Sequence, residues 1–130
     1  MLTETFFDTL LKNYEEEKGI FLEPEEREAL EDFLCTSFDT DQLQSRITKK
    51  TAARILWNFL QTVCGEKPVD WGKAAELKDI YDCKVCADAV AQVYVRGILR
   101  ESRPGFFGME DDLMEEELFR IIKVVLCNYS

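Results

Sequence analysis

The sequence contains no histidine, only three prolines and no long apolar run. The absence of histidine removes the commonest general base and the commonest metal ligand. No apolar stretch approaches the roughly 20 residues of a transmembrane helix, so we expect no membrane insertion. Bases are also scarce, with 16 against 26 acids and a net charge of −10. That charge repels nucleic acid, so we expect no nucleic-acid partner.

A length of 130 residues with 46% apolar and 32% charged residues predicts one soluble, folded domain, residues 1–130. The first residues carry Glu4 and Asp8 and lack a basic start, so they do not resemble a secretory leader. The expected location is cytoplasmic if Met1 is the native start. It is the cell surface if a leader has been removed.

Five cysteines are present, and an odd number in a chain of this size favours free thiols in a reducing compartment. Cys83 and Cys86 form the one CxxC motif. At a helix start such a pair can be reactive, and two of the four ligands of a zinc site could come from it. The expected redox context, a βαβ pattern, is absent. We therefore expect the cysteines to act as small, buried apolar residues, and we expect no cofactor. A metal bound at Cys83 and Cys86 is the alternative.

Apolar residues recur at three- and four-residue spacing in five segments, which predicts an all-α fold of about five helices with negligible strand content. An N-terminal helix is expected within residues 1–20. Two helix–loop–helix units should follow, at residues 24–64 and 77–127, with residues 37–46 as a polar loop. The first helix of the second unit should run over about 82–96 with Val85 inward, and its second over about 114–127 with Phe119 inward.

The second helices of the two units align, which suggests an internal duplication. The order of motifs resembles the S-layer homology family. The residues that carry this resemblance are Lys78-Asp79-Ile80, Val93-Tyr94, Gly97-Ile98-Leu99, Gly105-Phe106-Phe107-Gly108 and Arg120-Ile121-Ile122, with Ile47-Thr48-Lys49 in the first unit. The resemblance covers about residues 77–125, and a weaker resemblance covers residues 24–64.

The resemblance implies a bacterial, non-enzymatic binding module for an anionic cell-wall polysaccharide. The sequence departs from the family's ligand signature, because Lys50-Thr51 replaces Ala-Glu and Met114-Glu115 stands where Thr-Arg is expected. Family members usually carry three repeats, and this chain has at most two. The alternative function is therefore a cytoplasmic protein–protein interaction or regulatory module that has lost the sugar site.

Cations and aromatic residues in the matching segments are the candidate ligand-binding residues. Cations near a helix entrance could hold an anionic sugar or carboxylate by charge-assisted hydrogen bonds, and an aromatic pair could stack on a sugar. The candidates are Arg46, Thr48, Lys49, Lys50, Arg54, Arg100, Arg103, Phe106 and Phe107. The ordinary alternative is that the cations are solvated helix ends and the two phenylalanines plug the core.

Catalytic patterns are missing. The sequence has no glycine-rich phosphate loop, no nucleophile elbow and no Ser/His pair. We expect a protein that is not an enzyme, whose partner is a cell-wall polysaccharide or another protein. A cysteine-dependent metal or redox protein is the third hypothesis.

Overall fold

A computed structural model describes residues 1–128 and confirms the all-α prediction. Over these residues the only β pairing consists of three isolated bridges. The elements are α1 (Thr3–Lys18), α2 (Pro24–Ser37), α3 (Thr40–Leu43), α4 (Lys49–Thr62), the 3-10 helix η1 (Gly72–Glu76), α5 (Ala87–Val95) and α6 (Glu115–Asn128).

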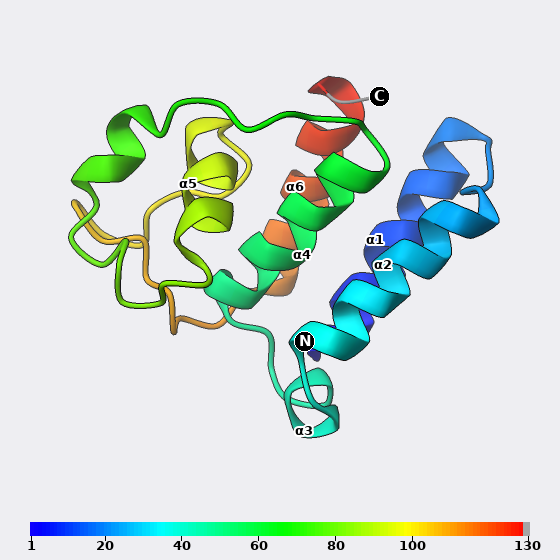
Figure 1. The fold of residues 1–130 in the computed structure, drawn as a ribbon, viewed down its shortest axis with the longest axis horizontal. Helices are drawn as coiled ribbons and strands as arrows, with labels where there is room; N and C mark the ends of the chain where they lie inside the picture. The colour runs from blue at the N-terminus through cyan, green and yellow to red at the C-terminus, as the bar shows by residue number, and fades with distance from the viewer. Residues whose placement is uncertain (129–130) are drawn as a thin grey trace.

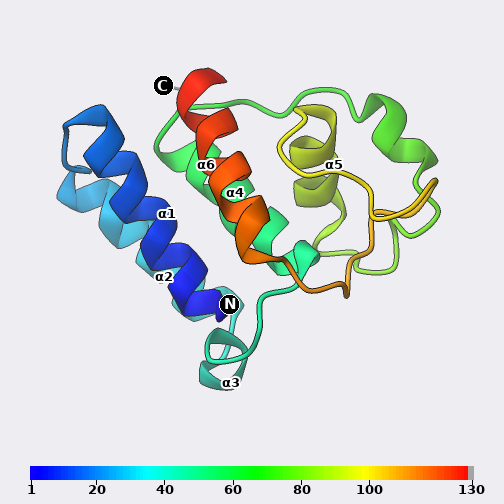
Figure 2. The same ribbon diagram turned by 180° about the vertical axis from the view of Figure 1, so that it is seen from behind.

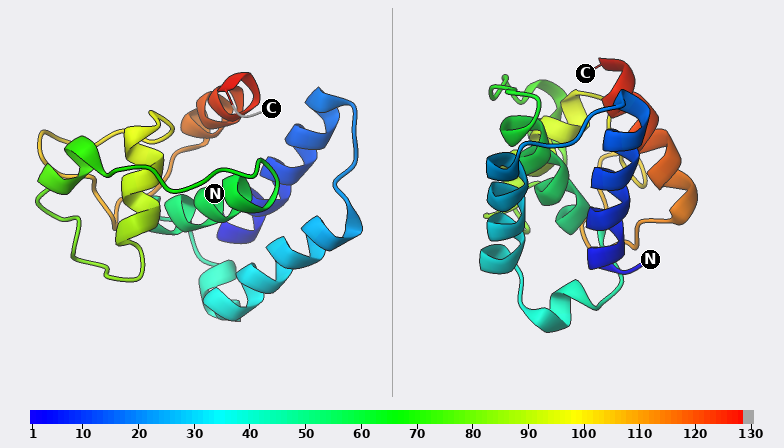
Figure 3. Two further views of the ribbon diagram at one scale, coloured as in Figure 1. Left: turned by 45° about the horizontal axis from the view of Figure 1, so that its top comes forward. Right: turned by 90° about the vertical axis from the view of Figure 1, so that its right-hand side faces the viewer.

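Helices α1 and α2 run in opposite directions, and α4 crosses the centre of the molecule (Figure 1). Seen from behind, α6 lies across α4, and α5 stands on the far side from α1 (Figure 2). Helix α4 packs against α1, α2 and α5, whereas α6 packs against α1. Figure 3 shows the same arrangement from above and from the side, with α1 between α2 and α6.

The helix ends follow from local chemistry. Gly19 ends α1 with φ +68°, a left-handed conformation that glycine adopts without a Cβ penalty. Pro24 is the first residue of α2, and Glu23 and Glu26 exchange side-chain and backbone hydrogen bonds there as a capping box. The helices together enclose one continuous apolar core, in which Phe6, Phe59 and Ile121 are fully buried.

Backbone hydrogen bonds join three segments that are far apart in the sequence. The Ile47 N–H donates to the carbonyl of Met1 at 2.9 Å, and the Thr3 N–H donates to that of Ser45 at 3.0 Å. On the other side, the Leu113 N–H donates to the Ile47 carbonyl at 3.0 Å. Main-chain hydrogen bonds therefore hold the N-terminal ends of α1, α4 and α6 together.

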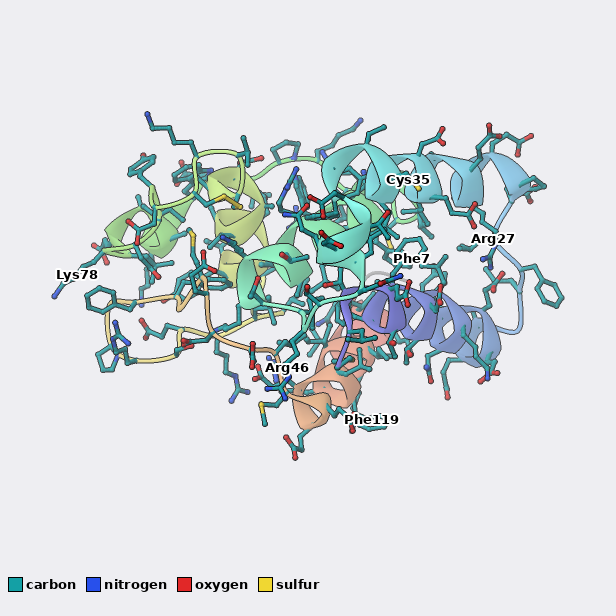
Figure 4. The ribbon with its side chains drawn as sticks, turned by 90° about the horizontal axis from the view of Figure 1, so that it is seen from below. Phe7, Arg27, Cys35, Arg46, Lys78 and Phe119 are labelled. Atoms are coloured by element: carbon teal, nitrogen blue, oxygen red, sulfur yellow. A yellow bond between two sulfur atoms is a disulfide. The ribbon has the colours of Figure 1, made fainter. Side chains whose placement is uncertain are left out.

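Three local predictions are wrong. The polar loop at residues 37–46 contains the short helix α3, whose cap Asp39 accepts a hydrogen bond from the Gln42 N–H. Helix α5 begins at Ala87 because residues 82–86 form turns, which leaves Val85 76% exposed. Phe119 is 71% exposed on α6 and projects away from the helix in Figure 4.

None of the helices between residues 1 and 128 has the length and apolar character needed to cross a bilayer.

Candidate functional site

Lys49 is buried, with 3% of its surface exposed. Its Nζ donates hydrogen bonds to the carbonyls of Arg100 and Phe107 and to Ser102 Oγ, at 2.5 to 3.0 Å. The same ammonium lies 4.5 Å from the centre of the Phe107 ring. Burial lowers the pKa of Lys49, against nearby carboxylates that raise it. The expectation that Lys49 is a solvent-facing ligand contact is wrong, because it fastens residues 100–107 to α4.

Asp79 fastens the same loop from the opposite direction. Its two carboxylate oxygens accept hydrogen bonds from the N–H groups of Phe107 and Gly108, both at 2.9 Å. Burial raises the pKa of Asp79, but backbone N–H donors together hold that pKa below its ordinary value. The main-chain N–H of Phe107 thus donates to Asp79, and its carbonyl accepts from Lys49. We refer to residues 100–108, held in this way, as the clamped loop.

The other predicted cations of the first unit are also engaged within the chain. Arg46 lies 3.7 Å from the Asp112 carboxylate, and Lys50 forms an ion pair with Glu110. Arg54 is half-buried over the rings of Phe33 and Phe38, at 5.8 and 5.0 Å. The Thr48 hydroxyl donates to Thr51 Oγ1 at 3.1 Å. These four residues and Lys49 do not form one open cationic site.

Phe106 and Phe107 have different surroundings. Phe107 has no exposed surface, so it is a core residue and the prediction that it stacks on a sugar is wrong. Phe106 is half-buried, with the Arg103 guanidinium 4.5 Å and the Lys78 ammonium 5.4 Å from its ring centre. The backbone also joins this group, since the Lys78 N–H donates to the Gly105 carbonyl at 2.7 Å.

We call Lys78, Arg103 and Phe106 the basic tip of the clamped loop. Within residues 1–128, neither Lys78 nor Arg103 has a carboxylate within salt-bridge distance, and the same holds for exposed Arg100. Figure 4 shows Lys78 extending from one end of the molecule, away from Arg46 near its middle. The paired cation Arg46 therefore lies apart from the basic tip, whose cations Lys78 and Arg103 have no ion pair among residues 1–128.

A cavity of about 240 Å³ adjoins the basic tip. Its lining combines residues of both charges with two sulfur-containing residues: Asp79, Asp82, Cys83, Arg103, Phe106, Gly108, Met109, Glu110 and Asp111. Gly108 is required here, because a Cβ at its φ of +85° would overlap the side chains of Ser102 and Asp111. We refer to this hollow as the Cys83 cavity.

The cysteines differ from the expectation of five free, mostly buried thiols. Cys83 and Cys86 form a disulfide, whereas Cys35 and Cys127 are exposed free thiols and Cys64 is a half-buried one. Across residues 1–128, no group of three or more His, Cys, Asp or Glu residues is placed to hold a metal ion. The disulfide removes the two thiolates that the alternative zinc site would have needed.

The three free cysteines should differ in reactivity. Burial, helped by Glu66, raises the pKa of Cys64 to about 11 from the ordinary 9.0. At pH 8, Cys64 should therefore hold roughly 100-fold less thiolate than an ordinary exposed thiol, and it should alkylate correspondingly slowly. Mass spectrometry after timed iodoacetamide treatment measures this, with Cys35 and Cys127 as internal references. A single rate for all three thiols would contradict it.

The structural roles of two residues of the site were not predicted from the sequence, although signals for both were present: Lys49 was predicted as a ligand contact, and Asp79 was not among the candidates. Lys49 lies three residues before Ala52 and seven before Leu56, which places it on the buried face of α4. Asp79 interrupts the apolar residues Leu77 and Ile80, and such an acid needs donors when it is buried.

No model of a protein family matches the chain, and comparisons with curated proteins and with solved structures found no match.

Proposed function

We propose that this protein is a non-enzymatic binding module that holds an anionic polymer at the basic tip. The observation that carries the proposal is that Lys78 and Arg103 have no carboxylate partner among residues 1–128, while the loop beneath them is fastened by Lys49 and Asp79. A fixed loop loses little conformational freedom on binding. Two unneutralised cations, with Arg100 close in sequence, supply charge-assisted hydrogen bonds.

The resemblance to S-layer homology modules suggests the chemical class of the polymer, an acidic cell-wall polysaccharide. The net charge of −10 slows the approach of any polyanion, so binding depends on short-range contacts at the basic tip. Affinity should fall with salt, since exposed charges are screened beyond about 10 Å at 0.1 M ionic strength.

Removing the basic tip should abolish most of this binding. For the double variant Lys78→Ala, Arg103→Ala we expect an affinity at least about tenfold lower, because two charge-assisted contacts are lost. Sedimentation with purified Gram-positive wall fragments at low and high salt measures it. The matched control is Arg46→Ala, Lys50→Ala, which removes two cations that are already paired. No pelleting of the wild type at either salt, with the helical fold intact, would retire this function.

A second function, protein–protein interaction, is favoured by the groove between α1 and α6. Two adjoining hollows of about 400 and 340 Å³ share Phe119, and Leu2, Leu118, Ile122 and Leu126 complete the apolar lining. Glu17 and Glu115 line the groove together with one cation, Lys123. Further acids are exposed on the same two helices: Glu4, Asp8 and Glu116. An amphipathic helix with an apolar stripe and basic flanks fits this combination.

Phe119→Asp should disrupt that interaction. With a 20-residue Lys/Leu amphipathic helical peptide as the probe, we expect affinity to fall at least about tenfold, because a large apolar contact is replaced by a charge. Fluorescence anisotropy measures it, and a Glu/Leu peptide of the same pattern should bind more weakly. Phe21→Asp is the control, since Phe21 is 88% exposed and does not line the groove. Equal affinities for the two variants would remove this candidate.

A further inference from the structure

The Cys83–Cys86 disulfide lies at the start of a helix and beside a cavity. Cys86 is the residue before the first turn of α5, and its N–H donates to the Cys83 carbonyl at 3.1 Å. Cys83 lines the Cys83 cavity. The first N–H groups of a helix lack partners within it, and with the helix dipole they stabilise a thiolate.

The two sulfur-bearing residues differ in access. Cys86 is 2% exposed and belongs to the core, whereas Cys83 is half-exposed. An incoming thiolate can therefore reach Cys83 but not Cys86. This asymmetry separates an attacked sulfur from a leaving sulfur, which is what thiol–disulfide exchange requires.

The bond contributes little to holding the fold together. It joins residues separated by only three positions, and a closed loop this short restricts the unfolded chain least. Helix α5 is positioned independently of it, by packing against α4 and through Gln92, whose side chain exchanges two hydrogen bonds with the backbone of Val69. The disulfide can thus open without the domain losing its main contacts.

We propose that Cys83 and Cys86 form a redox-active disulfide that exchanges with thiols of a polypeptide, an activity beyond the binding function. A substrate thiolate attacks Cys83 Sγ and forms a mixed disulfide, while the Cys83–Cys86 bond breaks and Cys86 leaves as a thiolate at the start of α5. A second thiolate of the same substrate then attacks the substrate sulfur atom of the mixed disulfide. Cys83 is released as a thiolate. The substrate dithiol is oxidised by two electrons, and the pair Cys83 and Cys86 is reduced by two.

The surroundings indicate a polypeptide rather than a small thiol. Val85, inside the motif, is 76% exposed, and Tyr81, two residues before Cys83, is 65% exposed, so exposed apolar side chains lie close to Cys83 in the sequence. Such side chains can contact a bound polypeptide. The lining of the Cys83 cavity holds four acids, Asp79, Asp82, Glu110 and Asp111, against one base, Arg103. This excess of negative charge disfavours glutathione, a small thiol with net negative charge.

Equilibration in glutathione buffers tests whether the bond is redox-active. The protein carries Cys35→Ser and Cys127→Ser, so that no exposed single thiol contributes, and alkylation followed by intact mass measures the fraction with the disulfide. We expect one two-electron transition, with both forms populated as the ratio of reduced to oxidised glutathione varies. A bond that forms at no ratio, or is reduced at none, would overturn the proposal, and the helical signal in circular dichroism checks the fold throughout.

Trapping assigns the roles of the two cysteines. In the same background, reduced Cys86→Ser should attack a disulfide-bridged peptide and accumulate a stable mixed disulfide at Cys83. Reduced Cys83→Ser should do so at least about tenfold more slowly, because Cys86 is buried. Equal trapping by the two variants would refute the assignment of roles.

Substitution of Val85 tests the substrate class. Val85→Ser should slow exchange with a valine-rich bridged peptide about fivefold and leave exchange with oxidised glutathione unchanged, because only the peptide can use an apolar contact. An equal decrease with both probes would exclude polypeptide selectivity. Wall-fragment binding is unaffected by these outcomes, since neither cysteine nor Val85 belongs to the basic tip.

Discussion

Replacing Lys49 by methionine is expected to lower the free energy of unfolding by about 3 kcal/mol. Methionine keeps the length and the apolar stem, but three acceptors lose their donor: the carbonyls of Arg100 and Phe107, and Ser102 Oγ. Hydrogen bonds to a charged donor contribute about 1.5–3 kcal/mol each, and loss of a shared donor is less than additive. Urea denaturation followed by circular dichroism measures the change.

Lys50→Met is the matched control for Lys49→Met. The two lysines are neighbours at the start of α4, but the ion pair of Lys50 is with Glu110, whose side chain is 74% exposed. An exposed ion pair contributes less than about 1 kcal/mol. If both variants lost the same stability, the clamping role of Lys49 would be wrong. A double alanine substitution at 49 and 50, which looks harmless in the sequence, is therefore expected to destabilise the domain.

Asp79→Asn is expected to cost about 2 kcal/mol at pH 7. The amide retains one acceptor oxygen, but its NH2 group then faces a backbone N–H, so one of the two donors of Phe107 and Gly108 stays unsatisfied. Asp82→Asn serves as the control, because Asp82 is exposed.

The loss from Asp79→Asn should depend on pH. Backbone donors outweigh burial and hold the folded-state pKa of Asp79 below its ordinary value of 3.8. The carboxylate therefore contributes its full stability above that ordinary value, and the contribution disappears as pH falls through the folded pKa. Wild type and variant should differ most near neutral pH, and the difference should shrink as pH falls below 3.8 and through the folded pKa. A difference that stayed constant down to the pH of acid unfolding would show that ionised Asp79 is not what holds the loop.

The helices with a clear apolar stripe could be predicted from the sequence. Helix α1 occupies Thr3–Lys18 as expected, since its stripe is regular and Gly19 ends it. The start of α5 could not be located by the same means. The residues around Cys83 and Cys86 continue the apolar spacing, while the disulfide holds them in turns before Ala87. The odd number of cysteines suggests free thiols. An odd total does not exclude a disulfide within one short motif, and Cys83 and Cys86 form one.

The candidate site was only partly predictable, because residue type does not fix what a side chain contacts. Arg103 and Phe106 were predicted, and the structure brings them together with Lys78. Phe107 has the same chemistry as its neighbour but turns into the core, since consecutive residues in an extended segment point in opposite directions. Lys49 was taken for a surface cation because lysine is rarely buried without partners. Its partners come from residues more than 50 positions away.

The main-chain hydrogen bonds at the N-terminal ends of the helices affect how the chain folds during synthesis. Residues 45–47 pair with the N-terminus, but the N–H groups of Lys49 and Lys50 donate to the carbonyls of Asp111 and Met109. Helix α1 is made before α6, against which it packs. Contacts between distant segments form late, because a long loop must close before they yield any stabilisation. The face of α1 that contacts α6 therefore leaves the ribosome uncovered, and this part of the core closes only after α6 has been made.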